Sequence, residues 1–149
     1  MTADSTIPSS PARAAKMDPR LAAAIARGEK VRQQLAAAEG GSASSTDVAG
    51  LLRVAKSTVI RRWRSHRLVA WKQDRAVRFP RWQFDGAKLL EGIEEILKTF
   101  HSDDQWRVMR YFLSKRISLG DRRPLDLLRE GNVTKVVAHA KAYAADNTW

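Results

Sequence analysis

The sequence predicts a mainly α-helical protein, in which two short helices joined by a tight turn precede a β-hairpin and then a small bundle of helices. Three observations support this class. Apolar residues recur at helical spacing through most of the chain, apolar and polar residues alternate over residues 69–79, and Gly or Pro separates several of the segments. With 149 residues, 44% of them apolar, the chain is long enough to bury a core.

The basic charge is concentrated in one part of the chain. The net charge is +11, and residues 44–82 alone contribute +8, whereas residues 1–43 contribute +2 and residues 83–149 contribute +1. A field of this sign favours a polyanionic partner, either nucleic acid or an anionic membrane surface.

Several classes of protein are excluded or disfavoured by composition. The chain has no cysteine, which excludes disulfides, thiolate zinc sites and a cysteine nucleophile and suits a reducing compartment. The apolar run at residues 21–26 is too short for a signal peptide or a membrane span. We therefore expect a soluble, cytoplasmic protein that does not enter a membrane.

The N-terminal part divides into a leader and one helix. Residues 1–16 are rich in Pro, Ser and Ala without an apolar period, which predicts a disordered leader. Within residues 17–43, Asp18 and Pro19 form a cap and first-turn pair for an Ala-rich helix, which Gly40 and Gly41 would end.

Residues 44–82 predict two short helices and a hairpin. Ser45 or Thr46 caps the first helix, and the second begins near Lys56 after a tight turn. On a 3.6-residue period one face of the second helix is apolar and packs on a core, through Val59, Ile60 and Trp63. The opposite face carries hydrogen-bond donors, with one residue at its edge: Ser57, Thr58, Arg61, Arg62, Ser65 and, at the edge, Arg64.

The alternating segment predicts a β-hairpin that ends at Pro80. Val69 and Trp71 alternate with polar residues before Gln73-Asp74-Arg75, and Val77 and Phe79 do so after it. Lys72 and Arg75 then lie near the tip. The whole unit has the order of a helix-turn-helix with a wing.

Residues 83–149 predict a small helical domain of nearly balanced charge. Three segments with helical spacing have starts at Asp85, Ser102 and Asn132, and Pro124 begins a further short helix. Their apolar positions are Leu89, Leu90, Ile93, Ile96, Leu97 and Phe100; Trp106, Met109, Phe112 and Leu113; and Val133, Val136, Val137 and Ala140.

The donor face of the second helix has the chemistry of a DNA-reading surface. The major groove of B-DNA admits one helix, which must bring short polar side chains and Arg to base edges and phosphates. Residues 57–69 contain no acid, whereas a solvated helix usually mixes charge signs. The candidate contacts are Ser57, Thr58, Arg61, Arg62, Arg64 and Ser65 on the helix and Lys72 and Arg75 on the hairpin. A merely solvated basic face remains the alternative.

The segment VAGLLRVAKSTVIRRWRSHRLVAW resembles MerR-like and excisionase-like winged helix-turn-helix domains. A small residue at Ala49 and a tryptophan at Trp63 match the pattern by which those domains pack their two helices. The sequence departs from them at Ala55, where those domains often place a polar cap.

The C-terminal pattern resembles the toxin-binding domain of Xre/MbcA/ParS-type antitoxins. It comprises Leu119-Gly120, Arg123-Pro124-Leu125, Leu128 and Gly131 before a last helix. The resemblance implies a type II antitoxin that represses its own operon by binding double-stranded DNA and neutralises a RES-domain toxin that consumes NAD. We expect a homodimer, because repressors usually read two half-sites. The resemblance also implies partner contacts in the last helix, with Val136, Val137 and Tyr143 as candidates.

Trp149 ends the chain with no core left to join, and it is a candidate anchor for a partner or for this domain's own surface. A stand-alone DNA-binding regulator or nucleoid-associated protein with a helical dimerisation domain is the alternative function.

No pattern of catalytic, metal-binding or cofactor-binding residues is found. His66, His101 and His139 are far apart in the sequence without a ligand partner at metal-binding spacing, and Asp103-Asp104 suits the first turn of a helix. Gly40-Gly41 lacks the strand and lysine of a phosphate-binding loop. We therefore expect a protein that is not an enzyme and needs no cofactor or metal.

Overall fold

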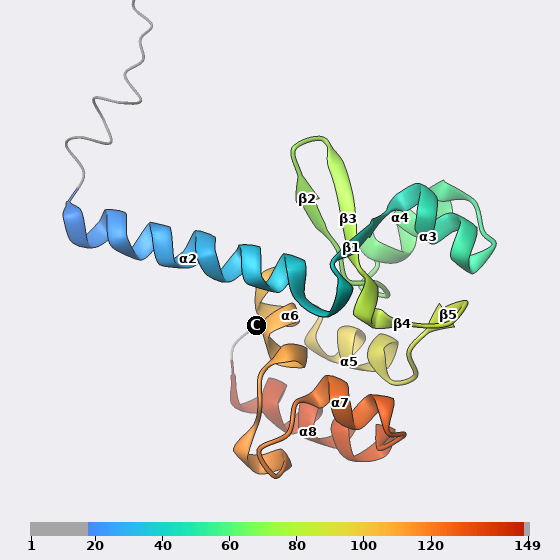
Figure 1. Cartoon of the computed structure of the whole chain (residues 1–149). Coiled ribbons are helices and arrows are strands. Elements are labelled where there is room, and N and C mark those ends of the chain that lie inside the picture. The colour runs from blue at the N-terminus through green and yellow to red at the C-terminus, as the bar shows by residue number, and fades with distance from the viewer. Residues whose placement is uncertain (1–17, 148–149) are drawn as a thin grey trace, which may run out of the picture. The chain divides into compact units, whose positions relative to one another are not determined.

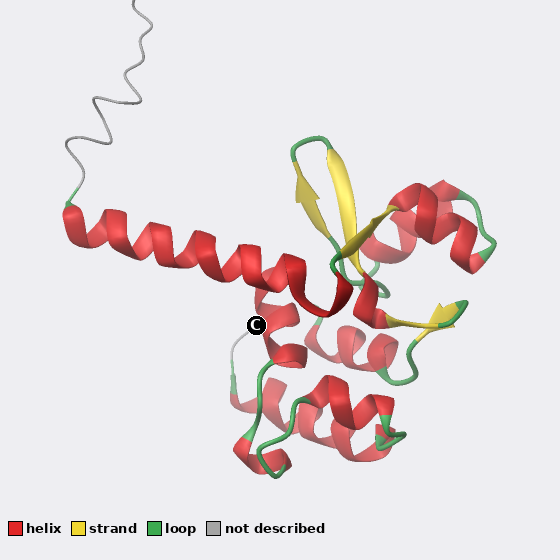
Figure 2. Cartoon of the chain, viewed as in Figure 1, coloured by secondary structure: helices red, strands yellow, loops and turns green. Residues whose placement is uncertain are grey.

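The computed structural model describes residues 18–147, and the chain divides after Gln34 into two units, the second of which begins at Leu35. Helices dominate the described residues, and small antiparallel sheets accompany them (Figures 1 and 2). The predicted mainly α class is therefore confirmed. No helix within residues 18–147 has both the length and the apolar character needed to cross a membrane. The predicted leader, residues 1–16, lies outside the described part of the chain.

Helices and short 3-10 turns (η) alternate with brief strands along the chain. In order they are α2 (Pro19–Ala37), η2 (Ala38–Gly40), β1 (Ser42–Ser44), α3 (Ser45–Leu52), α4 (Lys56–Arg64), β2 (Trp71–Gln73), β3 (Ala76–Pro80), η3 (Arg81–Gln83), β4 (Phe84–Asp85), β5 (Lys88–Leu89), α5 (Ile93–Phe100), α6 (Gln105–Leu113), η4 (Ile117–Leu119), α7 (Pro124–Arg129) and α8 (Val133–Asp146).

Helix α2 begins where the sequence predicts. Asp18 Oδ1 accepts a hydrogen bond from the backbone N–H of Arg20 at 2.8 Å, and Pro19 occupies the first helical position. After the helix, Gly40 and Gly41 have φ values of 93° and 79°, a region that glycine adopts without steric cost. None of the residues of α2 is buried.

Helices α3 and α4 form the predicted pair, joined by a three-residue link. Ser44, the residue before the predicted caps, accepts a hydrogen bond from the N–H of Asp47 at 3.0 Å and so caps α3. Helix α4 begins after Ala55 without a side-chain cap, as the sequence predicts. Val48 and Val59 are fully buried, and this small core comprises Ala43, Val48, Val59, Leu68, Ala70 and Phe79.

The predicted hairpin is confirmed and belongs to a three-stranded antiparallel sheet. Strand β2 pairs with β3 across a turn at Asp74 and Arg75, and Pro80 is the last residue of β3. The third strand, β1, pairs with the other edge of β3, with Ser42 opposite Pro80. Its Ser-Ala-Ser sequence carries no strand pattern, so the sequence does not predict it.

The prediction of a helix that starts at Asp85 is wrong for its first residues. Residues 84–89 form the short hairpin β4–β5, and helix α5 begins only at Ile93. Two glycines explain the difference: Gly86 turns the hairpin with φ of 62°, and Gly92 precedes α5 with φ of 96°. Both conformations interrupt a helix and suit glycine.

The larger core is formed mainly by α5, α6, α7 and α8. Helix α6 is capped by Asp104, which accepts from the N–H of Arg107 at 3.2 Å, and not by the predicted Ser102. Pro124 begins α7, as predicted, and Asn132 precedes α8 without a side-chain cap. The helical members of the larger core include Ile93, Ile96, Phe100, Met109, Tyr111, Phe112, Leu125, Leu128, Val136 and Ala140.

The two cores lie within one compact unit, and the boundary that the sequence predicts after residue 82 falls inside it. Trp71 and Trp82, from the N-terminal side of that boundary, belong to the larger core. The fully buried Gln83 donates from Nε2 to the carbonyls of Val69 (2.8 Å) and Pro80 (3.1 Å) and accepts at Oε1 from the N–H of Val69 at 2.8 Å. A packed junction therefore joins the sheet to the helical half through Trp71 and Trp82, and Gln83 satisfies the backbone groups beside it.

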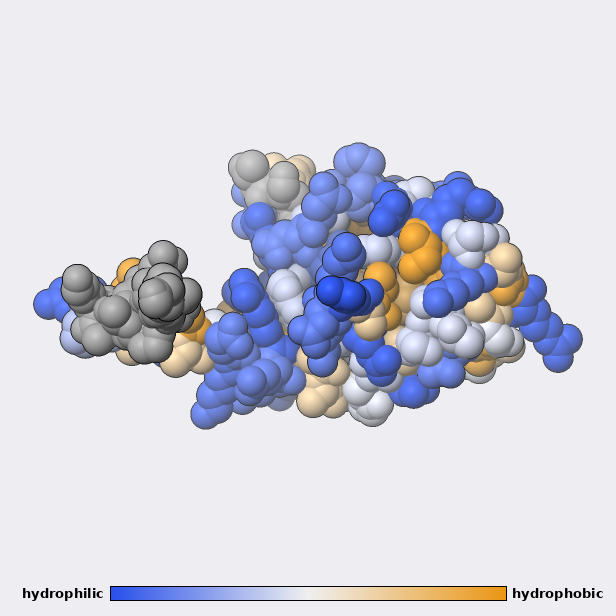
Figure 3. Space-filling model, turned by 90° about the horizontal axis from the view of Figure 1, so that it is seen from above, coloured by the Kyte–Doolittle hydropathy of each residue, from blue (hydrophilic) through white to orange (hydrophobic). Residues whose placement is uncertain are grey.

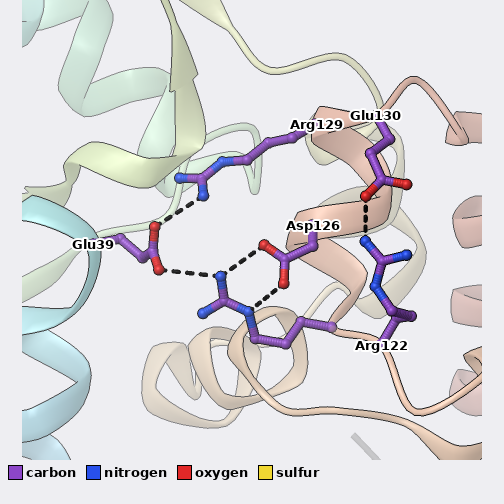
Figure 4. A network of polar contacts seen from close by, with 6 residues as sticks. Glu39, Arg122, Asp126, Arg129 and Glu130 are labelled. Carbon is purple, nitrogen blue, oxygen red and sulfur yellow. Dashed lines mark hydrogen bonds and ion pairs between the residues drawn. The ribbon is translucent and has the colours of Figure 1, made fainter.

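A charged network ties residue 39 to helix α7 (Figure 4). The Glu39 carboxylate accepts hydrogen bonds from Arg129 at 2.9 Å and Arg123 at 3.1 Å, and Arg123 also makes two 2.7 Å bonds to Asp126. The bonds from Arg129 and Arg123 lower the pKa of Glu39, and the bond from Arg123 lowers the pKa of Asp126. Arg122 pairs with Glu130 beside this network.

Candidate nucleic-acid interface

The polar face of α4 is open to solvent, as the helical period predicts. Ser57, Arg61, Arg64 and Ser65 are exposed, and Thr58 is half-buried. Arg61 lies within 3.5 Å of the Thr58 hydroxyl, one turn earlier on the helix. The structure therefore brings these five predicted contacts together on one exposed helix surface.

The opposite face of α4 holds the helix in place. Val59 is fully buried, and Ile60 and Trp63 pack against the small core. The guanidinium of Arg64 lies 5.9 Å from the centre of the Trp63 ring, close enough for a cation–π contact. Helix α4 can therefore present its polar face while its apolar face keeps it fixed on the core.

Arg62 lies only partly on the exposed polar face of α4. It is half-buried at the edge of α4 and lines a cleft together with Arg67 and Lys88. The sequence could not show this, because Lys88 lies in a segment predicted to be helical and forms instead the start of β5.

The hairpin β2–β3 supplies a second set of exposed cations. Lys72 and Arg75 are both exposed, with Arg75 in the turn. Arg78, by contrast, is structural, because its Nε donates to the Ser42 hydroxyl and its terminal nitrogen to the Ser42 carbonyl, each at 3.0 Å, which holds β1 to β3. Figure 3 looks down on the side toward which this hairpin points, and hydrophilic side chains cover most of it.

These cations have no ionic partner within the described chain. Among residues 18–147, no Lys or Arg between positions 56 and 88 forms an ion pair, whereas Arg122, Arg123 and Arg129 in the helical half are all paired. An uncompensated set of cations favours binding of a polyanion.

Two of the partner contacts expected in the last helix, Val136 and Val137, are buried in the structure. Val136 is fully buried and Val137 is 7% exposed, so both pack the larger core and offer no surface to another protein. Tyr143 is half-buried, with its ring 4.9 Å from the Arg116 guanidinium. Trp149 lies outside the described residues.

A hydrogen-bonded chain that the sequence does not predict runs through His139. The Tyr111 hydroxyl lies 2.7 Å from His139 Nδ1, and the Ser118 hydroxyl lies 2.8 Å from Nε2. Burial raises the pKa of Tyr111, so its hydroxyl stays protonated and needs an acceptor, which Nδ1 provides. In the tautomer with its proton on Nε2, His139 donates from that nitrogen to the Ser118 hydroxyl.

This arrangement makes stability depend on pH. Burial, followed by the charge of Arg116, lowers the pKa of His139 below its ordinary value of 6.5. The unfolded chain therefore binds more protons near that pH, and the free energy of unfolding decreases as the pH falls through about 6.5. We expect urea unfolding at about pH 5.5 and about pH 7.5 to show a larger loss on acidification for the wild type than for His139→Gln. Equal losses in the two proteins would contradict this role of His139.

The other two histidines lie closer together than their sequence separation indicates. The rings of His66 and His101 have centroids 4.2 Å apart, and His66 Nε2 lies 3.0 Å from a carboxylate oxygen of Asp103. These contacts join the segment after α4 to the segment after α5. No group of three or more His, Asp or Glu side chains within residues 18–147 is placed to hold a metal ion.

The fold, though not the sequence, is similar to a known one. No protein-family model matches the chain, and no curated protein matches it. Among solved structures, the NMR structure of Rv2175c is similar, with a TM-score of 0.60 and 24% sequence identity over 72% of this chain and 83% of that chain. At this identity the similarity shows a shared fold.

Proposed function

We propose that α3, α4 and the hairpin β2–β3 form a winged helix-turn-helix that binds double-stranded DNA. The observation that carries this proposal is the exposed face of α4, on which the side chains are donors or cations without an ionic partner in the described chain. The hairpin adds Lys72 and Arg75 in the same compact unit.

The physical argument follows from groove geometry. Ser57, Arg61 and Ser65 are spaced one turn apart, so they can contact base edges along one stretch of a major groove. Arg61 reads guanine best, because its guanidinium can donate two hydrogen bonds to O6 and N7. The cations at the hairpin tip contact backbone phosphates, which set the position of the helix without reading sequence.

For the whole chain we propose an antitoxin that represses its own operon as a homodimer and binds a RES-type toxin through its helical half. The C-terminal pattern from Leu119 to Gly131 supports this assignment through its resemblance to antitoxins. A stand-alone DNA-binding regulator would share the DNA surface and lack the toxin.

The DNA assignment is tested with Arg61→Ala. If Arg61 reads a base, the variant should lose about 1 to 3 kcal/mol of binding free energy on a duplex taken from upstream of its own gene, and should lose specificity at one position. Lys135→Ala, which also removes one positive charge but from an exposed position in α8, is the control. Fluorescence anisotropy measures both, and equal affinity of the two variants would refute the role of α4 as the reading helix.

The antitoxin assignment is tested by capture of the tagged protein from its own host, with nuclease treatment to remove DNA bridging. Mass spectrometry should find a stoichiometric small protein that is toxic when expressed alone. Recovery of this chain by itself would favour the stand-alone regulator.

A further inference from the structure

The cleft beside α4 is a second place where cations converge. It has a volume of about 250 Å³, and its charged lining residues are Arg62, Arg67, Lys88 and Glu94. Apolar residues complete its walls: Leu52, Leu68, Ala87 and Leu89.

Each of the three cations is positioned by a defined element. Arg62 lies in the last turn of α4, and its carbonyl accepts a 2.8 Å hydrogen bond from the N–H of Arg67. Lys88 begins strand β5, and the hairpin β4–β5 is held in place because Phe84 and Leu89 pack against the small core. Two segments that are separate in sequence, the end of α4 with the turn after it and the start of β5, therefore bring positive charge to one cleft.

The charge of the cleft is not neutralised by the chain. None of Arg62, Arg67 and Lys88 forms an ion pair within residues 18–147. The one acid at the cleft, Glu94, already pairs with Lys98 at 2.9 Å on the same helix. Like charges that line one cleft repel one another, and a bound anion relieves that repulsion.

We propose that this cleft binds a phosphate of the DNA backbone next to the base pairs that α4 contacts. The hairpin β4–β5 then acts as a second backbone-binding element, since in Figure 1 the hairpins β2–β3 and β4–β5 lie on different sides of the pair α3–α4. Backbone phosphates are bound by Arg and Lys without regard to sequence, so the cleft contributes affinity and position. This inference rests on the proposed DNA-binding function.

The alternative use of these side chains is to cover the apolar walls of the cleft with their aliphatic stems while their charges stay in water. That role would give them no part in DNA binding.

The test compares two double variants that each remove two positive charges. Arg67→Ala/Lys88→Ala alters the cleft, and Lys115→Ala/Lys135→Ala alters exposed residues elsewhere. All four positions are exposed, so we expect both variants to fold, and thermal unfolding is measured to check this. The dissociation constant of each is measured by anisotropy at several salt concentrations, on a duplex of arbitrary sequence and on the duplex from upstream of the gene.

The cleft variant should bind both duplexes several-fold more weakly than the control variant. Its slope of log affinity against log salt should decrease by about 1 for each phosphate that the altered cleft no longer binds. A slope and affinity equal to those of the control would overturn the cleft assignment while leaving α4 as the reading helix, provided that Arg61→Ala still weakens binding. Absence of DNA binding by the wild type at low salt would overturn both proposals.

Discussion

Replacing Gln83 by alanine should lower the free energy of unfolding by about 3 kcal/mol or more. The side chain is fully buried and satisfies three backbone groups: the N–H and carbonyl of Val69 and the carbonyl of Pro80. Leaving a buried polar group without a partner costs about 1 to 3 kcal/mol, and alanine would leave three. Urea unfolding followed by circular dichroism measures the change.

Two further variants sharpen this experiment. Gln73→Ala removes the same atoms from an exposed position in β2 and should change the free energy of unfolding by less than about 0.5 kcal/mol. Gln83→Glu keeps an acceptor for the N–H of Val69 but removes the donor to two carbonyls, and it buries a carboxyl group, so it too should destabilise the fold strongly. If Gln83→Ala matched Gln73→Ala, the junction would not depend on these hydrogen bonds.

Gly92→Ala should be the second most damaging substitution, with a loss of about 2 to 5 kcal/mol in the free energy of unfolding, the sum of a backbone cost and a packing cost. Gly92 has φ of +96°, which costs an L-residue about 1 to 2 kcal/mol. A Cβ atom there would also lie 2.8 Å from Leu128 Cδ2 and 3.1 Å from Val133 Cγ1, and crowding of a packed core typically costs about 1 to 3 kcal/mol.

Gly86→Ala separates the two causes. Gly86 also has a positive φ, of +62°, but nothing lies within 4 Å of the position that its Cβ would occupy. Its loss of stability should therefore contain the backbone cost alone and be smaller than that of Gly92→Ala. Equal losses for the two variants would show that the crowding against Leu128 and Val133 relaxes without cost. Thermal or urea unfolding of both proteins decides this.

The sequence predicts those features that depend on local chemistry. Asp18 and Pro19 mark the start of α2, and the alternation around Asp74 predicts the β2–β3 hairpin. The prediction of the exposed polar face of α4 is confirmed except at Arg62, because a single periodic pattern decides which side of an amphipathic helix is buried.

Features that depend on distant partners are not predicted. Leu89 and Leu90 continue the helical spacing of α5, yet they lie before it, because Gly86 and Gly92 adopt positive φ values that no pattern of apolar residues reveals. The burial of Gln83 could not be predicted from an isolated polar residue, since its main partner lies 14 residues away.

The same limit applies to the sites. Resemblance alone assigns Val136 a partner role, whereas the packing of α8 buries it. The cleft at Lys88 needs the β4–β5 hairpin, where the apolar spacing predicts a helix instead.

The tryptophans at the junction have an optical consequence. The rings of Trp71, in β2, and Trp106, in α6, have centroids 5.2 Å apart. The fluorescence of an indole depends on what packs against it, so separation of these two rings changes the tryptophan emission. The native chain therefore carries a label-free reporter of whether the sheet and the helical half remain in contact.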